Sequence, residues 1–174
     1  AIEQLQNIEN PHKIAIRTAK LNIINDAMES DELLRIKYAS KAASVANAWK
    51  KWQGETKGLK RFNTIALKQQ QEKEFLQWAA DKKEYNSLLN QYKELYQKRK
   101  DLILAASYLN EAGKRGAEIV GWAADIYKKL NVSAEKLEEA KEQLKAGAEE
   151  FYKDYDAATD QKILVEMLRL YNQN

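Results

Sequence analysis

Apolar residues recur along the chain in steps of three and four, which is the spacing of one face of an α-helix. The pattern is cleanest from Tyr85 to Leu109, where leucine and tyrosine alternate with charged and amide side chains. Alternation of period two, which would indicate a β-strand, never lasts four residues with β-branched content. One proline and six glycines leave few points at which a helix has to end. The sequence therefore predicts an all-α fold, an antiparallel bundle of about six or seven helices, some of them long.

Capping residues and glycines place the boundaries of these helices. Asn10, with Pro11 directly after it, predicts where the first helix begins, because asparagine is a favoured N-cap and proline a favoured first helical residue. Thr159 is expected to cap the last helix. The remaining boundaries are expected at Ser30 or Asp31, Gly54 or Gly58, Gly113 to Gly116, and Asn131 to Ser133. Near Asn86-Ser87 the pattern allows either a break or a helix that continues from the preceding one.

The segment from Leu34 to Gly54 has two unlike faces when it is read as a helix. One face is a bulky apolar stripe made of Leu34, Tyr38, Ala42, Val45, Trp49 and Trp52. Opposite it lies a face of small, nearly uncharged residues, which are Ser40, Ala43, Asn47 and Gly54. A surface helix would carry lysine and glutamate there, so the small residues indicate that something approaches the backbone closely. We expect the stripe to be buried and Asn47 to face away from the bundle.

Composition excludes several classes of protein. The net charge of +3 comes from 29 basic and 26 acidic residues that are interspersed, so no basic stripe indicates nucleic acid as a partner. The lack of cysteine excludes a disulfide framework and thiol chemistry. No apolar run approaches the roughly 20 residues of a membrane span, so no membrane contact is expected. The length favours a single helical domain over residues 1–174, and because Ala1 is not a natural start the chain is expected to be a fragment or a mature form.

No catalytic or metal constellation can be found in the sequence. A Ser-His-acid triad needs a histidine, and the one histidine, His12, is beside Pro11 without a nucleophile turn anywhere in the chain. Zinc and di-iron sites need several Cys, His or Glu-x-x-His ligands, which are absent. We therefore expect no catalytic residue, no metal and no cofactor. The segment Gly113-Lys114-Arg115-Gly116 could bind an anion, but a helix break accounts for it better because the strand-turn-helix setting of a phosphate loop is missing.

Asn47 is the one candidate binding residue. An asparagine within a helix costs about half a kcal/mol or more relative to alanine, so its presence calls for a reason. From the residues alone, the simpler account is a structural hydrogen bond to a neighbouring helix. Contact with a ligand is the other account, because the amide can both donate and accept.

Several segments of the chain also carry a family resemblance. The most specific lie in the first third, and looser ones follow: Asn10 to Arg17, Met28 to Asp31, Ile36 to Ala39, Ala46 to Gly54, Lys57 to Arg61, Lys68 to Phe75, and Thr159 to Leu164. Together they resemble the helical domain of the bacterial serine dipeptidyl aminopeptidases, the dipeptidyl-peptidase seven and eleven group.

The resemblance implies a function within a longer parent protein. Members of this group remove dipeptides from free peptide N-termini, using a triad in a chymotrypsin-like double β-barrel and a helical domain, inserted in that barrel, which covers the active-site cleft. This chain would be the non-catalytic cap domain of such a hydrolase, a serine protease, and would not be an enzyme by itself. The family's free-amine recognition includes an asparagine of the helical domain, and Asn47 is the position that best matches it.

The resemblance also implies partners and a location. The partners would be the N-terminus of a peptide substrate and, within the parent, the missing catalytic domain; a homodimer of the parent is left open. The location would be the periplasm, the cell surface or the exterior of a Gram-negative bacterium. The alternative is a helical interaction or scaffolding module, which would bind a partner helix along the stripe from Tyr85 to Leu109.

Overall fold

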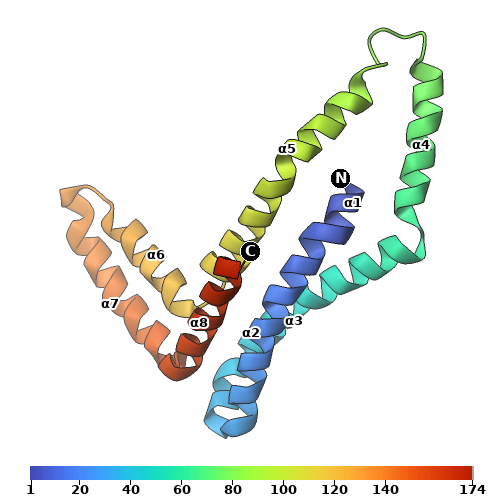
Figure 1. Ribbon diagram of the computed structural model, residues 1–174. Helices are drawn as coiled ribbons and strands as arrows, with labels where there is room; N and C mark the ends of the chain where they lie inside the picture. Colours follow the sequence, from blue (N-terminus) through green and yellow to red (C-terminus); the bar gives the residue numbers. More distant parts are fainter. Residues whose placement is uncertain (174) are drawn as a thin grey trace. The chain divides into compact units, whose positions relative to one another are not determined.

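The computed structural model describes residues 1–173, so that Asn174, at the end of the expected domain, lies outside them. Within residues 1–173 the chain contains helices and no strand, which confirms the all-α prediction (Figure 1). The α-helices are α1 (Ile2–Gln4), α2 (Asn10–Ser30), α3 (Glu32–Arg61), α4 (Thr64–Ala79), α5 (Leu88–Tyr108), α6 (Glu118–Leu130), α7 (Leu137–Asp154) and α8 (Ala157–Gln173). Two π-helical segments, η1 (Leu5–Glu9) and η2 (Leu109–Lys114), and a short 3-10 helix, η3 (Ala134–Lys136), complete the set.

The helices belong to two compact units. The first unit contains Ala1–Ala15 and Ala48–Ser107, and the second contains Ile16–Asn47 and Tyr108–Asn174. Helices α2, α3 and α5 therefore contribute residues to both units. The expectation of one domain over residues 1–174, inserted in a larger barrel, stays a prediction.

The first helix begins earlier than the Asn10–Pro11 pair predicts. Helical structure is continuous from Ile2 to Ser30, and Asn10 has helical backbone angles, φ −63° and ψ −44°. The Asn10 side chain does not cap the helix but donates to Glu55 Oε2 at 2.9 Å and Thr56 Oγ1 at 3.2 Å. The wider π-helical turn of η1 lies where the Pro11 ring would otherwise meet the carbonyl four residues before it, so the helix continues past the proline.

The other boundaries of the first unit follow from its loops. Helix α3 does not weaken at its glycines but ends at Arg61, just before Asn63, which has a left-handed φ of 46°. Helices α4 and α5 are separate and joined by the loop of residues 80–87, so of the two alternatives that the sequence leaves near Asn86-Ser87 the structure has the break (Figure 1). At the start of the chain, Gln4 Nε2 donates to the Tyr96 carbonyl oxygen at 2.6 Å, which links α1 to α5.

The second unit contains two helical hairpins, one between α2 and α3 and one between α6 and α7 (Figure 1). Between α2 and α3, Asp31 Oδ1 accepts from the backbone N–H groups of Leu33 at 2.6 Å and Leu34 at 3.1 Å, which confirms Asp31 as the N-cap. Between α6 and α7, the ring of Trp122 stacks on that of Phe151 with centroids 5.2 Å apart. Each hairpin thus places antiparallel helices side by side, as the sequence predicts.

Helix α8 is capped by Asp156, and the expectation for Thr159 is wrong. Asp156 Oδ1 accepts from the Thr159 N–H at 2.8 Å, so Thr159 lies inside the first turn. Hydrogen bonds from Thr159 hold the pKa of Asp156 below its usual value. The next acidic residue, Asp160, is fully buried and binds the start of α6: Oδ1 accepts from Glu118 N–H at 2.6 Å and Oδ2 from Ile119 N–H at 2.9 Å.

Gly116 marks the break between η2 and α6 that the glycine pair predicts. A Cβ at this position would lie 1.9 Å from the carbonyl oxygen of Ala112 and 3.0 Å from Met167 Cγ of α8. The first of these atoms belongs to the backbone, which cannot swing aside as a side chain can. Glycine is therefore required here by close packing.

We expect Gly116→Ala to lower the free energy of unfolding by about 2 kcal/mol, because the backbone has to move to admit the methyl group. Gly121→Ala on α6 is the matched control, since a Cβ there meets no atom within 4 Å. In that helix, alanine should raise the free energy of unfolding by up to about 1 kcal/mol. Urea unfolding followed by circular dichroism measures both, and effects of the same sign would contradict this account.

Candidate functional site

Helix α3 has the exposed small-residue face that the sequence pattern predicts, but its apolar stripe is buried only in part. On the bulky stripe, Tyr38 and Ala42 are buried, while Leu34, Val45, Trp49 and Trp52 are half-buried. On the opposite face, Ser40, Ala43, Asn47 and Gly54 are all exposed. The stripe is thus fully buried only at Tyr38 and Ala42, and Trp52 is covered in part by the Lys13 ammonium, 5.3 Å from its ring centroid.

Asn47 lies on the exposed face of α3, in the second unit. No hydrogen bond to its side-chain amide occurs among residues 1–173, so the structure gives no support to the simpler account, a bond to a neighbouring helix. Further along the same face, a Cβ at Gly54 would meet no atom within 4 Å. The close approach that the small residues indicate is therefore not made by the described part of the chain. The assignment of Asn47 as a substrate-binding residue stays a prediction.

The remaining chemistry-bearing residues form no metal site. His12 is half-buried in α2. In the part of the chain that the structure describes, no group of three or more His, Cys, Asp or Glu is placed to hold a metal ion. Within the same range, no helix combines the length and the apolarity that crossing a bilayer requires.

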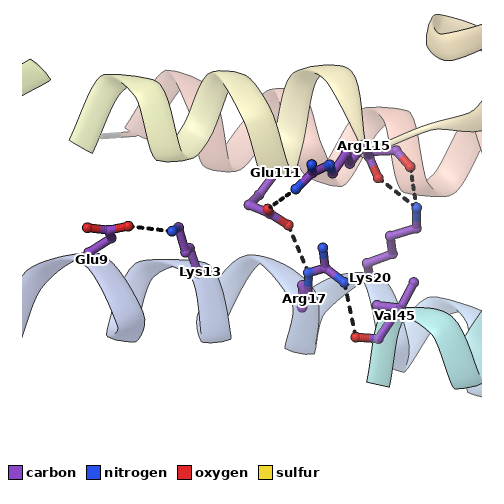
Figure 2. Close-up of polar contacts among 8 residues, drawn as sticks. Glu9, Lys13, Arg17, Lys20, Val45, Glu111 and Arg115 are labelled. Atoms are coloured by element: carbon purple, nitrogen blue, oxygen red, sulfur yellow. Dashed lines mark hydrogen bonds and ion pairs between the residues drawn. The ribbon is translucent and has the colours of Figure 1, made fainter. Parts of the chain in front are cut away.

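A charged cluster that the sequence does not reveal lies in the second unit (Figure 2). Arg17 Nε donates to Glu111 Oε2 at 2.8 Å, and its Nη1 donates to the Val45 carbonyl oxygen at 3.2 Å. Arg115 Nη1 donates to Glu111 Oε1 at 3.1 Å. Glu111 is only 4% exposed, so both of its oxygens are held by arginines in a buried setting. We call Arg17, Lys20, Glu111 and Arg115 the cationic cluster.

Lys20 joins this cluster from α2 and binds the end of η2. Its Nζ donates to the carbonyl oxygens of Arg115 at 2.8 Å and Gly116 at 2.5 Å (Figure 2). Cations are favoured at such helix ends because the last carbonyl groups carry partial negative charge. Burial lowers the pKa of Lys20, although nearby Glu118 and Asp160 act in the opposite direction.

The cationic cluster lines a cavity of about 230 Å³ in the second unit. Its lining residues are Ile16, Arg17, Lys20, Ser44, Val45, Glu111 and Arg115. Ser44 precedes Asn47 by three residues, so the two side chains project from neighbouring positions on the same helix. A larger and more open groove of about 630 Å³ lies between α2 and α8, lined by Ala19, Asn22, Ile23, Gln161, Lys162, Val165 and Glu166.

An exposed apolar stripe follows α5 in the first unit. Leu88, Leu95 and Leu102 recur every seven residues, with Tyr92 between the first two. Leu95 is 62% exposed and Leu102 69% exposed, whereas Ile103, on the adjacent face, is buried. Steps of three and four are the spacing of a coiled-coil seam, so this stripe has the pattern that would suit a partner helix.

Comparison with known proteins identifies the family. The model of the family described as Peptidase S46 matches residues 1–174. The Asp/Glu-specific dipeptidyl-peptidase of Flavobacterium psychrophilum is 37% identical over 178 residues, which cover 98% of this chain and 25% of that protein. Dipeptidyl-peptidase 7 of Porphyromonas endodontalis is 35% identical over 175 residues, which cover 99% of this chain and 21% of that protein. The chain thus spans about a quarter of the length of these curated relatives. These matches confirm the resemblance seen in the sequence, and the chain belongs to the peptidase S46 family.

Proposed function

We propose that this chain is the helical cap domain of a dipeptidyl aminopeptidase and that Asn47 helps to bind the free N-terminus of the peptide. The observation that carries the proposal is the exposure of Asn47 on a face of small residues, with no hydrogen-bond partner among residues 1–173. The amide oxygen of an asparagine that accepts from an ammonium group forms a charge-assisted hydrogen bond. A peptide with a blocked N-terminus cannot make that bond, so Asn47 would select free amines.

The small neighbours of Asn47 fit the same role. Ala43 is one helical turn before Asn47 and Ser40 is two turns before it, and both are exposed. Longer side chains at these positions would keep an extended peptide away from the helix. The small face therefore leaves room for a peptide backbone to reach the Asn47 amide.

Catalysis would belong to the rest of a longer parent protein. The relatives are named as dipeptidyl peptidases, and this chain matches about a quarter of their length, which leaves room in them for a separate catalytic domain. We propose a serine-type parent without a cofactor, located in the periplasm, at the surface or outside a Gram-negative bacterium. In it, the chain would contact the catalytic domain and cover the cleft, and whether the parent is a homodimer is left open.

The chain alone is expected to show no hydrolysis of dipeptidyl chromogenic substrates. Its sequence contains no nucleophile paired with a base, because it has one histidine and no nucleophile-turn motif whose serine that histidine could deprotonate. The assay compares the purified chain with the parent protein at equal molar concentration. Turnover by the chain that persists through further purification would contradict the non-catalytic role.

Photo-cross-linking of a substrate analogue tests the cap role directly. A dipeptidyl ligand with a diazirine on its first residue and a free N-terminus is bound to the parent protein and irradiated. We expect mass spectrometry to locate the cross-link on α3, near Ala43 and Asn47. The same ligand with an acetylated N-terminus should label this segment much less. The proposal would be refuted if no cross-link lies on α3, or if the free and the acetylated ligands label α3 equally.

The second candidate is a scaffolding module that binds a partner helix. Its specific support is the exposed stripe on α5, where Leu95 and Leu102 lie uncovered within this chain. Under this alternative, a partner would protect the α5 amides from hydrogen exchange, while the dipeptidyl ligand would leave α3 unlabelled. The two candidates therefore predict changes on different helices.

A further inference from the structure

We propose that the cavity lined by the cationic cluster in the second unit binds a small carboxylate. This inference does not depend on the cap function, because it rests on the charges and donors around the cavity. Of the segment Gly113 to Gly116, Arg115 lines this cavity, and the break between η2 and α6 already accounts for the glycines. Three points support the proposal: the charge balance, the available donors and the shape of the cavity.

Glu111 does not oppose an anion in this cavity, although it is part of the lining. Its Oε2 accepts from Arg17 Nε at 2.8 Å and its Oε1 accepts from Arg115 Nη1 at 3.1 Å. Both oxygens thus face a guanidinium group. Since two arginines share one carboxylate, the cluster has a positive excess before Lys20 is considered.

Lys20 adds a second positive charge, and among residues 1–173 it makes no ion pair with a carboxylate. Its two hydrogen-bond partners are the backbone carbonyl oxygens of Arg115 and Gly116, which are neutral. The two nearby acids have other partners. Glu118 Oε2 is 2.6 Å from Lys41 Nζ, and both oxygens of Asp160 accept from backbone N–H groups at the start of α6.

The charges of the cationic cluster and of its neighbours Lys41, Glu118 and Asp160 therefore do not sum to zero. Four are cations and three are carboxylates, which leaves one positive charge without a counterion among them. Burial lowers the pKa of Lys20, because removal from water disfavours its charged form. An anion bound in the cavity would favour the charged form of Lys20. The negative charge of that anion would balance the one positive charge that has no counterion.

Donors line the same cavity. An ammonium group has three N–H donors, and the carbonyl contacts of Lys20 use two of them. A guanidinium group has five, and the contact of Arg115 with Glu111 uses one. Ser44, an exposed residue, lines the cavity as well, and its hydroxyl group is of a kind that can donate to a carboxylate oxygen.

The size and the apolar part of the lining indicate which anion fits. The cavity of about 230 Å³ has room for a carboxylate and several water molecules. Ile16 and Val45 supply apolar surface on which a short methylene chain can pack. A small organic acid, or the side chain of an aspartate or glutamate in a peptide, has this combination of a planar anion and a short apolar stem.

Titration with succinate tests the proposal on the chain itself. Amide chemical shifts are followed by ¹H–¹⁵N NMR while succinate is exchanged for chloride at constant ionic strength. We expect saturable shifts at Lys20, Ser44 and Arg115. A second titration, with a blocked aspartyl dipeptide, distinguishes a small organic acid from an acidic side chain of a peptide. If both probes bind, the site accepts a peptide side chain. If succinate alone binds, the site accepts free acids and excludes peptides. If neither probe gives a saturable shift beyond that of chloride, the proposal is wrong.

Substitutions locate the binding in the cavity. Arg115→Gln and Lys20→Gln should each weaken succinate binding about tenfold or more, the loss of one hydrogen bond to a charged group. Lys114→Gln is the matched control, because it removes the same charge from the adjacent exposed position, outside the lining. It should change the affinity by no more than about twofold. Circular dichroism verifies that each variant is folded, and an equal loss in Lys114→Gln and Arg115→Gln would overturn the proposed site.

Discussion

Replacing Asp160 with alanine is expected to lower the free energy of unfolding by about 3 kcal/mol. Asp160 is fully buried, and its two carboxylate oxygens accept from the N–H groups of Glu118 and Ile119 at 2.6 and 2.9 Å. These donors belong to the first turn of α6, where N–H groups have no partner within the helix and a negative charge is favoured. Alanine would leave both donors unsatisfied beside the buried Ala117, and it would remove the link from α8 to α6.

Equilibrium unfolding in urea, followed by far-ultraviolet circular dichroism, measures this effect. Asp125→Ala on α6 is the matched control, since Asp125 is half-exposed and its ion pair among residues 1–173 is with Lys129, one turn along, at 3.2 Å. Such a pair contributes about half a kcal/mol or less. If Asp160→Ala costs no more than Asp125→Ala, the carboxylate does not hold the start of α6.

The helices and the faces of α3 could be predicted from the sequence because both depend on local periodicity. Residues three and four apart share a face whatever the rest of the chain does, so Tyr38 is buried and Asn47 is exposed as expected. The boundary at Asn10 could not be predicted in this way. It depends on Glu55 and Thr56, about 45 positions along the chain, which accept from the Asn10 amide and compete with its capping role.

The cationic cluster was missed for the same reason. Arg17 and Glu111 are 94 positions apart, and Lys20 binds carbonyl oxygens of the backbone, which carry no signal in the sequence. The π-helical segment η2, in which Glu111 lies, also has no reliable local pattern. Spacing along one helix thus predicts which side chains share a face, but the partners of a buried charge follow only from the tertiary fold.

In the proposed parent protein, Asn47→Ala is expected to lower kcat/KM for free-amine peptides roughly 10- to 150-fold. This range corresponds to the loss of one hydrogen bond to a charged group, about 1.5–3 kcal/mol. The fold should be almost unaffected, because Asn47 is exposed and alanine is the better helix former. The free energy of unfolding should therefore change by no more than about half a kcal/mol.

Two controls separate recognition of the amine from a general loss of activity. A substrate with a blocked N-terminus has no ammonium group, so whatever residual cleavage it undergoes should be nearly indifferent to Asn47→Ala. Asn25→Ala, at an exposed position of α2, removes the same side chain elsewhere and should leave kcat/KM unchanged within about twofold. If Asn47→Ala unfolds the protein, or lowers cleavage of free and blocked substrates alike, Asn47 acts through structure and not through the peptide N-terminus. A loss confined to free-amine substrates supports contact between the Asn47 amide and the ammonium group in the transition state, because the ammonium group is the feature of the substrate that Asn47 is proposed to bind.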